Sequence, residues 1–192
     1  MKTKLLLAVL LLSGNLVFGQ DTWTFDKAHT EILFSVKHLV ISEVGGKFKE
    51  FDGEVKSTGD DCDGREIQFN AQVESINTDN EQRDGHLKSD DFFNAAEYPE
   101  LKFDGKLVKD GSNYVLKGQM TIRDITKPIA FDVQYNGTVT DPWGNVKAGF
   151  KIMGSVNRFD YDLKWNALME AGGAVVDEEI NIVCNVELQK QV

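Results

Sequence analysis

Cysteine and histidine are scarce in this chain of 192 residues, which contains only two and three of them. Two cysteines are too few for a disulfide scaffold or a cysteine-rich zinc site. Common catalytic signatures are also missing, because the sequence has no G-x-S-x-G elbow, no H-E-x-x-H, no Walker loop and no G-x-G-x-x-G after a strand. The spacing of the three histidines matches no ligand pattern, which favours structural roles over a metal. The sequence therefore predicts no metal, no cofactor and no common enzyme class.

Basic residues are outnumbered, since 21 Lys and Arg stand against 31 Asp and Glu and give a formal net charge of −10. A nucleic-acid binder must neutralise phosphates with basic side chains, so this balance argues against a nucleic-acid partner. It also argues against electrostatic docking on anionic membranes. Hydrophobic residues at 41% and charged residues at 27% are typical of a globular domain.

The start of the chain has the pattern of a secretory signal peptide. Two lysines precede an apolar run over residues 5–12, and Val17-Phe18-Gly19 places small residues around a cleavage site. The apolar run is far shorter than a bilayer span, so a membrane anchor is not expected. We predict a signal peptide over residues 1–19, cleavage near Gly19, periplasmic or secreted localisation, and one mature domain over residues 20–192.

Export implies an oxidising compartment, in which the two cysteines are candidates for a disulfide. Cys62 lies in a polar turn rich in Gly and Asp, whereas Cys184 lies on the apolar face of an alternating run. An inward core thiol rarely meets a thiol in a turn. We therefore expect two separate thiols.

Alternation of apolar and polar residues with a period of two dominates the rest of the chain, and this pattern is typical of half-buried strands. The alternating runs lie at residues 32–38, 47–56, 67–73, 101–109, 114–122, 129–136, 146–156 and 180–188. Short links rich in Gly and Asp separate many of them, which favours antiparallel neighbours. Eight such strands can close into a barrel and so remove exposed edges. The sequence predicts an all-β domain of this kind.

One helical insertion interrupts the strands. Thr78-Asp79-Asn80-Glu81 fits a capping box with Thr78 as the N-cap, and we expect the helix to run to about Lys88. A second short turn should follow at Phe92-Phe93. Asn136-Gly137 is interpreted as a β-bulge near a strand end rather than as a hairpin turn.

The barrel interior poses the functional question, because eight strands enclose just enough space for packed side chains or for one small ligand. The inward aromatic residues suit a packed core and a lipid tunnel equally. His38 lies on an apolar strand face, either as a core histidine with satisfied nitrogens or as a polar group that orients a ligand head. The candidates for head-group contacts at the barrel mouth are Arg83, Lys88, Phe92 and Arg158.

Four motifs carry further information. They are W-T-F-D-K-A-H-T at residues 23–30, I-L-F-S-V-K-H at 32–38, R-D-G-H-L-K-S-D-D-F-F at 83–93 and V-N-R-F-D-Y at 156–161. With their neighbours they span residues 22–188 in order. In this respect the chain resembles the YceI-like family of secreted lipid- and polyisoprenoid-binding proteins.

The resemblance implies a lipocalin-like, eight-stranded antiparallel barrel with a long apolar cavity and no catalytic role. It also implies a polyisoprenoid such as a quinone, or another long-chain lipid or fatty compound, as ligand. The positions that would line the cavity are Phe34, Val36, His38, Phe69, Phe103, Met120, Phe131, Phe150 and Ile152. The chain departs from the family pattern by added acidic residues at Asp124, Asp162 and Glu179.

Three functions remain for comparison. The first is a non-catalytic periplasmic carrier that holds a long-chain isoprenoid or other lipid. The second is an interaction protein with a filled barrel and an acidic binding surface. The third is a lipid-modifying enzyme with His38 as general base, which requires a carboxylate or nucleophile within hydrogen-bond reach of the ring. A homodimer would be unsurprising, since symmetric pairs are the commonest oligomers.

Overall fold

The computed structural model describes residues 20–58, 62–167 and 175–191, so the expected signal peptide lies outside the described residues. The strands and helices within these ranges are β1 (Asp21–Phe25), β2 (Glu31–His38), β3 (Ser42–Phe48), β4 (Phe51–Ser57), β5 (Glu66–Gln72), η1 (Val73–Ser75), β6 (Ile76–Asn77), α1 (Glu81–Lys88), β7 (Glu100–Asp110), β8 (Asn113–Ile122), β9 (Ile125–Thr140), β10 (Val146–Asn157), η2 (Arg158–Tyr161) and β11 (Val176–Lys190). No helix among them is long and apolar enough to cross a membrane.

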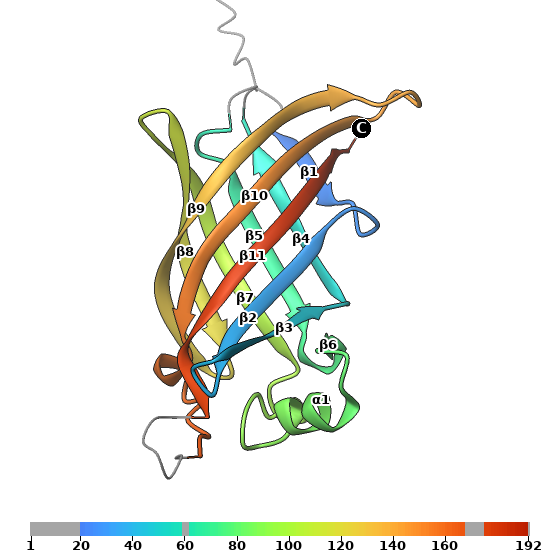
Figure 1. Ribbon diagram of the computed structural model, residues 1–192. Coiled ribbons are helices and arrows are strands. Elements are labelled where there is room, and N and C mark those ends of the chain that lie inside the picture. The colour runs from blue at the N-terminus through green and yellow to red at the C-terminus, as the bar shows by residue number, and fades with distance from the viewer. Residues whose placement is uncertain (1–19, 59–61, 168–174, 192) are drawn as a thin grey trace, which may run out of the picture.

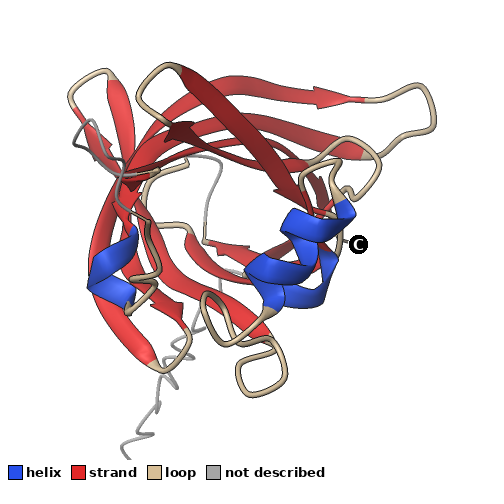
Figure 2. Cartoon of the chain, turned by 60° about the horizontal axis from the view of Figure 1, so that its bottom comes forward, coloured by secondary structure: helices blue, strands red, loops and turns tan. Residues whose placement is uncertain are grey.

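The strands form a closed antiparallel barrel with eight strand positions, as the alternation predicted (Figures 1 and 2). Three positions are each filled by two consecutive short strands. β1 pairs with the end of β11 and β2 pairs with its beginning. β4 and β3 then pair with β1 and β2, and β5 and β6 pair with β4 and β3. The sheet closes on itself because β11 pairs with β1 and β2 on one side and with β10 on the other.

The strand boundaries differ from the sequence prediction in several places. Residues 42–46 belong to β3 although no predicted alternating run covers them, and β6 was not predicted. The run at residues 47–56 is not one strand, because Lys49-Glu50 breaks it between β3 and β4. β1 was not predicted at all, since its five residues are too few to show a period. β9 carries the expected bulge, where Gly149 pairs with Gly137 and Phe150 pairs with Tyr135, so that Asn136 is the extra residue.

The helical insertion is present as α1, but its predicted cap is wrong. Asn80 is the N-cap, and its side chain accepts a hydrogen bond from the Arg83 backbone N–H. Thr78 instead donates its hydroxyl to the buried Asp84 carboxylate at 2.5 Å, and the same carboxylate accepts the Thr78 backbone N–H. Asp84 thereby ties the helix to the strand end before it. In Figure 1, α1 lies at the lower end of the barrel, on the side of β6.

The opposite end of the barrel is filled by side chains. The Arg65 guanidinium lies over the Trp23 ring at 4.9 Å and over the Phe150 ring at 5.9 Å. All three residues are buried, and the Trp23 indole N–H donates to the Ser57 hydroxyl. Cys62 is buried as well, and it forms no disulfide with Cys184. The prediction of two separate thiols is therefore confirmed. This packing closes the barrel at that end.

Candidate functional site

A cavity of about 610 Å³ occupies the α1 half of the barrel. Its walls are mainly the aliphatic and aromatic side chains of the inward strand faces. The polar side chains Thr78, Asn80, Gln82 and Arg83 line it only at the α1 end. Asn80 and Gln82 are exposed, so the cavity opens to the surface there. We call this opening the mouth.

Eight of the nine side chains predicted for the cavity line it, and they are Phe34, Val36, His38, Phe69, Phe103, Met120, Phe131 and Ile152. The ninth, Phe150, faces inward but lies beyond the cavity. Its ring packs on Tyr135 at 5.2 Å between ring centroids and lies beneath Arg65 in the closed end. The alternation along the strand thus identified Phe150 correctly as inward-facing. Its position along the barrel axis, however, places it in the packed end and not in the cavity.

The cavity floor is aromatic. Phe25 and Phe69 line the cavity with ring centroids 5.7 Å apart in an edge-to-face contact. Phe103 and Phe131 also line it, with centroids 6.2 Å apart. The wall therefore offers few polar groups at depth, and a bound molecule would contact hydrocarbon there.

His38 lies at the end of β2 and lines the cavity near the mouth. Its backbone carbonyl accepts hydrogen bonds from the Ser42 hydroxyl and the Ile41 N–H. Within the described part of the chain, no hydrogen bond or ion pair involves its ring. The carboxylate or nucleophile that general-base chemistry requires is therefore not found beside it among those residues.

Three rings meet at the mouth. The His86 ring stands edge-to-face against Phe92 at 5.0 Å and against Trp165 at 4.7 Å, and its Nε2 lies 2.9 Å from Asp91 Oδ2. All three rings line the cavity. Phe92 was predicted at the mouth, whereas His86 and Trp165 were missed as cavity residues. No local pattern identifies them, because the contact joins residues far apart in the sequence.

Arg83 lines the mouth and keeps part of its hydrogen-bonding capacity. Its Nε–H donates to the Thr78 hydroxyl at 2.8 Å and one Nη2–H donates to the Thr78 carbonyl at 2.7 Å. A guanidinium has five N–H donors, so three of them have no described protein partner. The side chain is half-buried and held in place by these bonds. It is the cation that the mouth can present to a polar ligand head.

Arg158 also lines the cavity, but four of its five N–H donors are occupied. Its side chain is buried and donates to four backbone carbonyls, those of Leu163, Trp165, Val176 and Asp177. Burial lowers the pKa of the guanidinium from its usual value. Arg158 therefore holds the segment that contains Trp165 against β11. The sequence analysis had instead predicted that its charge contacts a ligand head group.

Lys88 does not line the cavity. Its ammonium lies 3.5 Å from the exposed Glu74 carboxylate on the outer surface. Of the four side chains predicted at the mouth, Arg83, Phe92 and Arg158 line the cavity and Lys88 does not. The helix directs Lys88 away from the cavity. The charge pattern of the sequence does not show this direction, so it could not exclude Lys88 from the mouth.

Cys184 is the thiol of the cavity wall. It lies on β11 opposite Ile32 and Ile152, and it is buried. Burial raises the pKa of the Cys184 thiol to about 12. The thiol is therefore protonated at neutral pH and behaves as a small apolar side chain.

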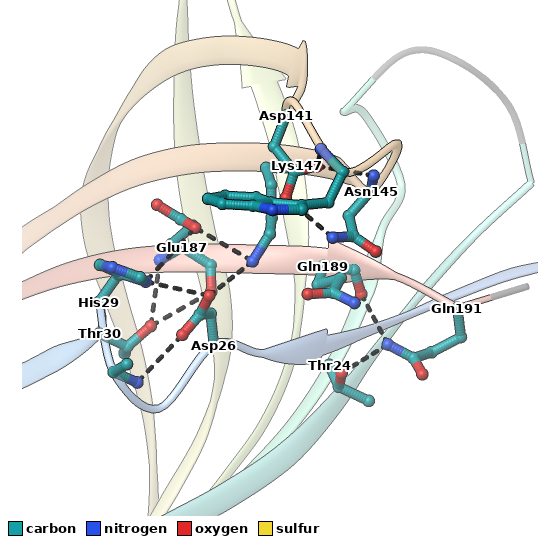
Figure 3. Close-up of polar contacts among 12 residues, drawn as sticks. Thr24, Asp26, His29, Thr30, Asp141, Asn145, Lys147, Glu187, Gln189 and Gln191 are labelled. Atoms are coloured by element: carbon teal, nitrogen blue, oxygen red, sulfur yellow. Dashed lines mark hydrogen bonds and ion pairs between the residues drawn. The ribbon is translucent and has the colours of Figure 1, made fainter.

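A separate polar cluster lies where the β1–β2 turn meets β10 and β11 (Figure 3). Ligand atoms of Asp26, His29 and Glu187 lie within 4.8 Å of one another, as a metal site would require. However, the Lys147 ammonium points between the two carboxylates, 2.5 Å from Asp26 and 3.3 Å from Glu187. Lys147 thus occupies the place of a cation. The hydrogen bond from Lys147 holds the Asp26 pKa well below its usual range, and Asp26 raises the pKa of His29.

Comparison with known proteins agrees with this architecture. The YceI-like domain model matches residues 23–188. The UPF0312 protein SA2479 of Staphylococcus aureus (strain N315) is 36% identical over 168 residues, which cover 86% of this chain and 95% of that protein.

Solved structures also match. The crystal structure of the Campylobacter jejuni YCEI protein is 31% identical, with a TM-score of 0.68, and the match covers 88% of this chain and 98% of that one. A polyisoprenoid binding domain from Saccharophagus degradans has a TM-score of 0.64 with the same coverage. At 14% identity this last likeness concerns the fold alone.

Proposed function

The chain belongs to the YceI-like family, and from that premise we propose that it is a non-catalytic periplasmic carrier of a long-chain lipid. Its ligand is an isoprenoid, such as a quinone or polyisoprenoid, or another long-chain lipid. The tail lies in the apolar cavity and the head lies at the mouth. The observation that carries this proposal is the apolar cavity of about 610 Å³ with polar lining at one end.

The size and lining of the cavity suit one extended hydrocarbon chain. Ligand pockets are usually about 300–1,000 Å³ and mostly apolar, with a few polar groups that fix orientation. The deep wall here is formed by groups such as Phe69, Phe103 and Ile182, and the polar groups lie at the mouth. This distribution matches an amphiphile whose polar end stays near solvent. The polyisoprenoid binding domain of the same fold supports the choice of ligand class.

The tail dominates the expected affinity. Each buried CH₂ contributes about 0.8 kcal/mol, so a chain of about twenty carbons offers on the order of 16 kcal/mol before costs. Association and ordering of the ligand oppose binding by several to about 15 kcal/mol. A partly exposed ion pair from Arg83 to a charged head adds about 0–1 kcal/mol. The head therefore sets orientation more than affinity.

The alternatives have less support. A filled barrel requires side chains that leave no room, whereas the cavity of about 610 Å³ has the volume of a ligand pocket. An enzyme that uses His38 as general base requires a polar partner for the ring, and none is found among the described residues. Both alternatives remain separable from the carrier by direct binding measurements.

Periplasmic localisation is part of the proposal and rests on residues 1–19. Expression of the full chain followed by N-terminal sequencing of the periplasmic fraction tests it. We expect a mature N-terminus at Gln20. A full-length chain retained in the cytoplasm would contradict export.

A pair of variants on β10 tests ligand binding. Ile152→Trp adds a large side chain at a wall position, while Met153→Trp adds the same side chain at the next residue, which does not line the cavity. Both proteins are titrated with geranylgeraniol and with a menaquinone, and bound ligand is measured after gel filtration. We expect wild type and Met153→Trp to bind one ligand, and Ile152→Trp to lose at least tenfold in affinity. Equal binding by both variants, or none by wild type, would overturn the proposal.

A further inference from the structure

The β2–β3 turn exposes an apolar tip. Val40 and Ile41 are 74% and 86% exposed. They follow Leu39, and these three residues alone connect β2 to β3. Exposed aliphatic side chains in consecutive positions are unusual for a turn, where polar residues and Gly prevail.

The backbone of this tip is also unfavourable for its side chains. Leu39 and Val40 have φ angles of 52° and 65°. Left-handed backbone suits Gly and Asn, while a β-branched residue such as Val is a genuine outlier there. Neither solubility nor turn geometry explains the apolar residues at this site, so a partner surface that covers them is the remaining physical reason.

The tip is continuous with the rim of the ligand cavity. His38 and Val44, which flank it on β2 and β3, both line the cavity. The Leu39 N–H donates to the carbonyl of Val175, another cavity residue, at 2.9 Å. In Figure 1 the β2–β3 turn lies at the same end of the barrel as α1. A surface that covers the tip therefore lies at the same end of the barrel as the mouth.

We infer that this tip, residues 39–41, inserts into the surface of a neutral lipid bilayer and brings the mouth to the membrane for ligand exchange. This inference rests on the proposed function, because the hydrocarbon tail of the ligand avoids exposure to water only if the mouth lies against the bilayer during exchange.

The charge of the protein favours a neutral bilayer over an anionic one. The chain is acidic overall, and Asp177, Glu178 and Glu179 follow Val176, which pairs with His38 at the rim. Anionic lipids are repelled, so apolar insertion carries the contact.

The experiment compares wild type with a variant in which Leu39→Asn, Val40→Gly and Ile41→Ser are combined. Asn and Gly accept left-handed backbone, so this variant should fold at least as well as wild type. The single change Ile41→Ser serves as a second variant that leaves the two strained positions untouched. Trp143→Ser is the matched control, because Trp143 is 84% exposed on the β9–β10 turn at the opposite end.

Two readouts separate docking from carrying. Flotation of the ligand-free proteins with phosphatidylcholine vesicles measures docking, and uptake of menaquinone from those vesicles measures exchange. Menaquinone supplied in detergent measures binding without a membrane. We expect the triple variant to lose its binding to vesicles. The rate of menaquinone uptake from vesicles should fall about ten- to a hundredfold for each aliphatic side chain that enters the bilayer in wild type. Detergent-supplied binding and the Trp143→Ser protein should be unchanged.

The other outcomes are decisive too. If wild type does not float, or if the triple variant and Ile41→Ser float like wild type, the bilayer inference is wrong. If the triple variant changes only the oligomeric state in sedimentation, the tip contacts a second copy of the chain and the inference is also wrong. If wild type floats in a tip-dependent manner but binds no menaquinone from detergent, docking stands and the proposed ligand fails.

Discussion

The Phe34 ring occupies the space that a side chain at Gly46 would need. The two residues are register partners on β2 and β3, and a Cβ on Gly46 would lie 2.3 Å from Phe34 Cζ and 2.8 Å from Thr78 Cγ2. Because Phe34 also forms part of the cavity wall, the missing side chain at Gly46 sets how far this ring projects into the cavity.

Gly46→Ala should therefore disturb both the fold and ligand binding. The added methyl displaces the Phe34 ring, and overpacking of this kind costs about 1–3 kcal/mol in the free energy of unfolding. Denaturant unfolding and titration with geranylgeraniol measure the two effects. The double variant Gly46→Ala with Phe34→Leu should recover part of the lost stability, because the smaller side chain makes room. Additive losses in the double variant would contradict this packing relationship.

Arg158→Met should destabilise the protein more than Arg83→Met does. Arg158 is buried and donates to four backbone carbonyls, so its loss leaves acceptors unpaired and lowers the free energy of unfolding by about 2–4 kcal/mol. Arg83 has fewer protein partners, and its replacement should cost about 1 kcal/mol. Arg83→Met should weaken binding of an anionic amphiphile such as a fatty acid but not of geranylgeraniol. Urea unfolding and paired titrations measure both effects, and the reverse ranking would refute the assigned roles.

Asp26→Asn should lower the free energy of unfolding at neutral pH. It should also make that free energy less dependent on pH in the acidic range. Lys147 holds the Asp26 pKa below its ordinary value of 3.8, so the carboxylate stabilises the folded state above about pH 4. That contribution is lost as pH falls through the lower pKa of the folded state. We expect a loss of about 1–3 kcal/mol at pH 7, shrinking toward zero in strong acid.

The matched control for this prediction is Glu54→Gln, which removes an exposed ion pair with Lys56. It should change the free energy of unfolding by less than about 1 kcal/mol. Urea titrations between pH 2 and pH 8 give the comparison. A difference between Asp26→Asn and wild type that grows as pH falls would show that the sign is wrong.

Cys184 should report on cavity occupancy. Its pKa is raised to about 12, so its reaction with a small maleimide should be about a thousandfold slower than that of an ordinary exposed thiol. The measurement uses the Cys62→Ser background, in which Cys184 is the single thiol, and bound menaquinone should slow the reaction further. The control is Asn185→Cys without either native cysteine, because residue 185 is exposed. Rapid labelling of Cys184, or no protection by ligand, would contradict its position in the wall.

The alternation in the sequence predicted most of the long strands and their inward faces, but not the position of each residue along the barrel axis. Alternation assigned Phe150 and Ile152 to the same inward face, and both do face inward. Only Ile152 reaches the cavity, because Phe150 lies nearer the closed end under Arg65. Phase distinguishes inside from outside, whereas height depends on the tilt and stagger of the whole barrel.

The mouth was harder to predict for a related reason. His86 and Trp165 are in contact although they lie far apart in the sequence, and neither lies in an alternating run. Arg158 was predicted as a head-group contact at the mouth, but its use as an internal donor depends on where the following segment returns to β11. Tertiary contacts of this kind leave no periodic signal in the sequence.

Mass spectrometry of the protein purified from its native compartment tests the central claim most directly. The full chain is expressed and the mature protein is isolated gently from the periplasmic fraction. The native mass spectrum of the intact protein gives the mass of any bound ligand, and the mass spectrum of an organic extract of the same sample identifies that ligand. The carrier account predicts one equivalent of an isoprenoid or other long-chain lipid in wild type and Met153→Trp, and less than one equivalent in Ile152→Trp. An unliganded mass for wild type that stays unchanged after incubation with menaquinone and geranylgeraniol would contradict the account.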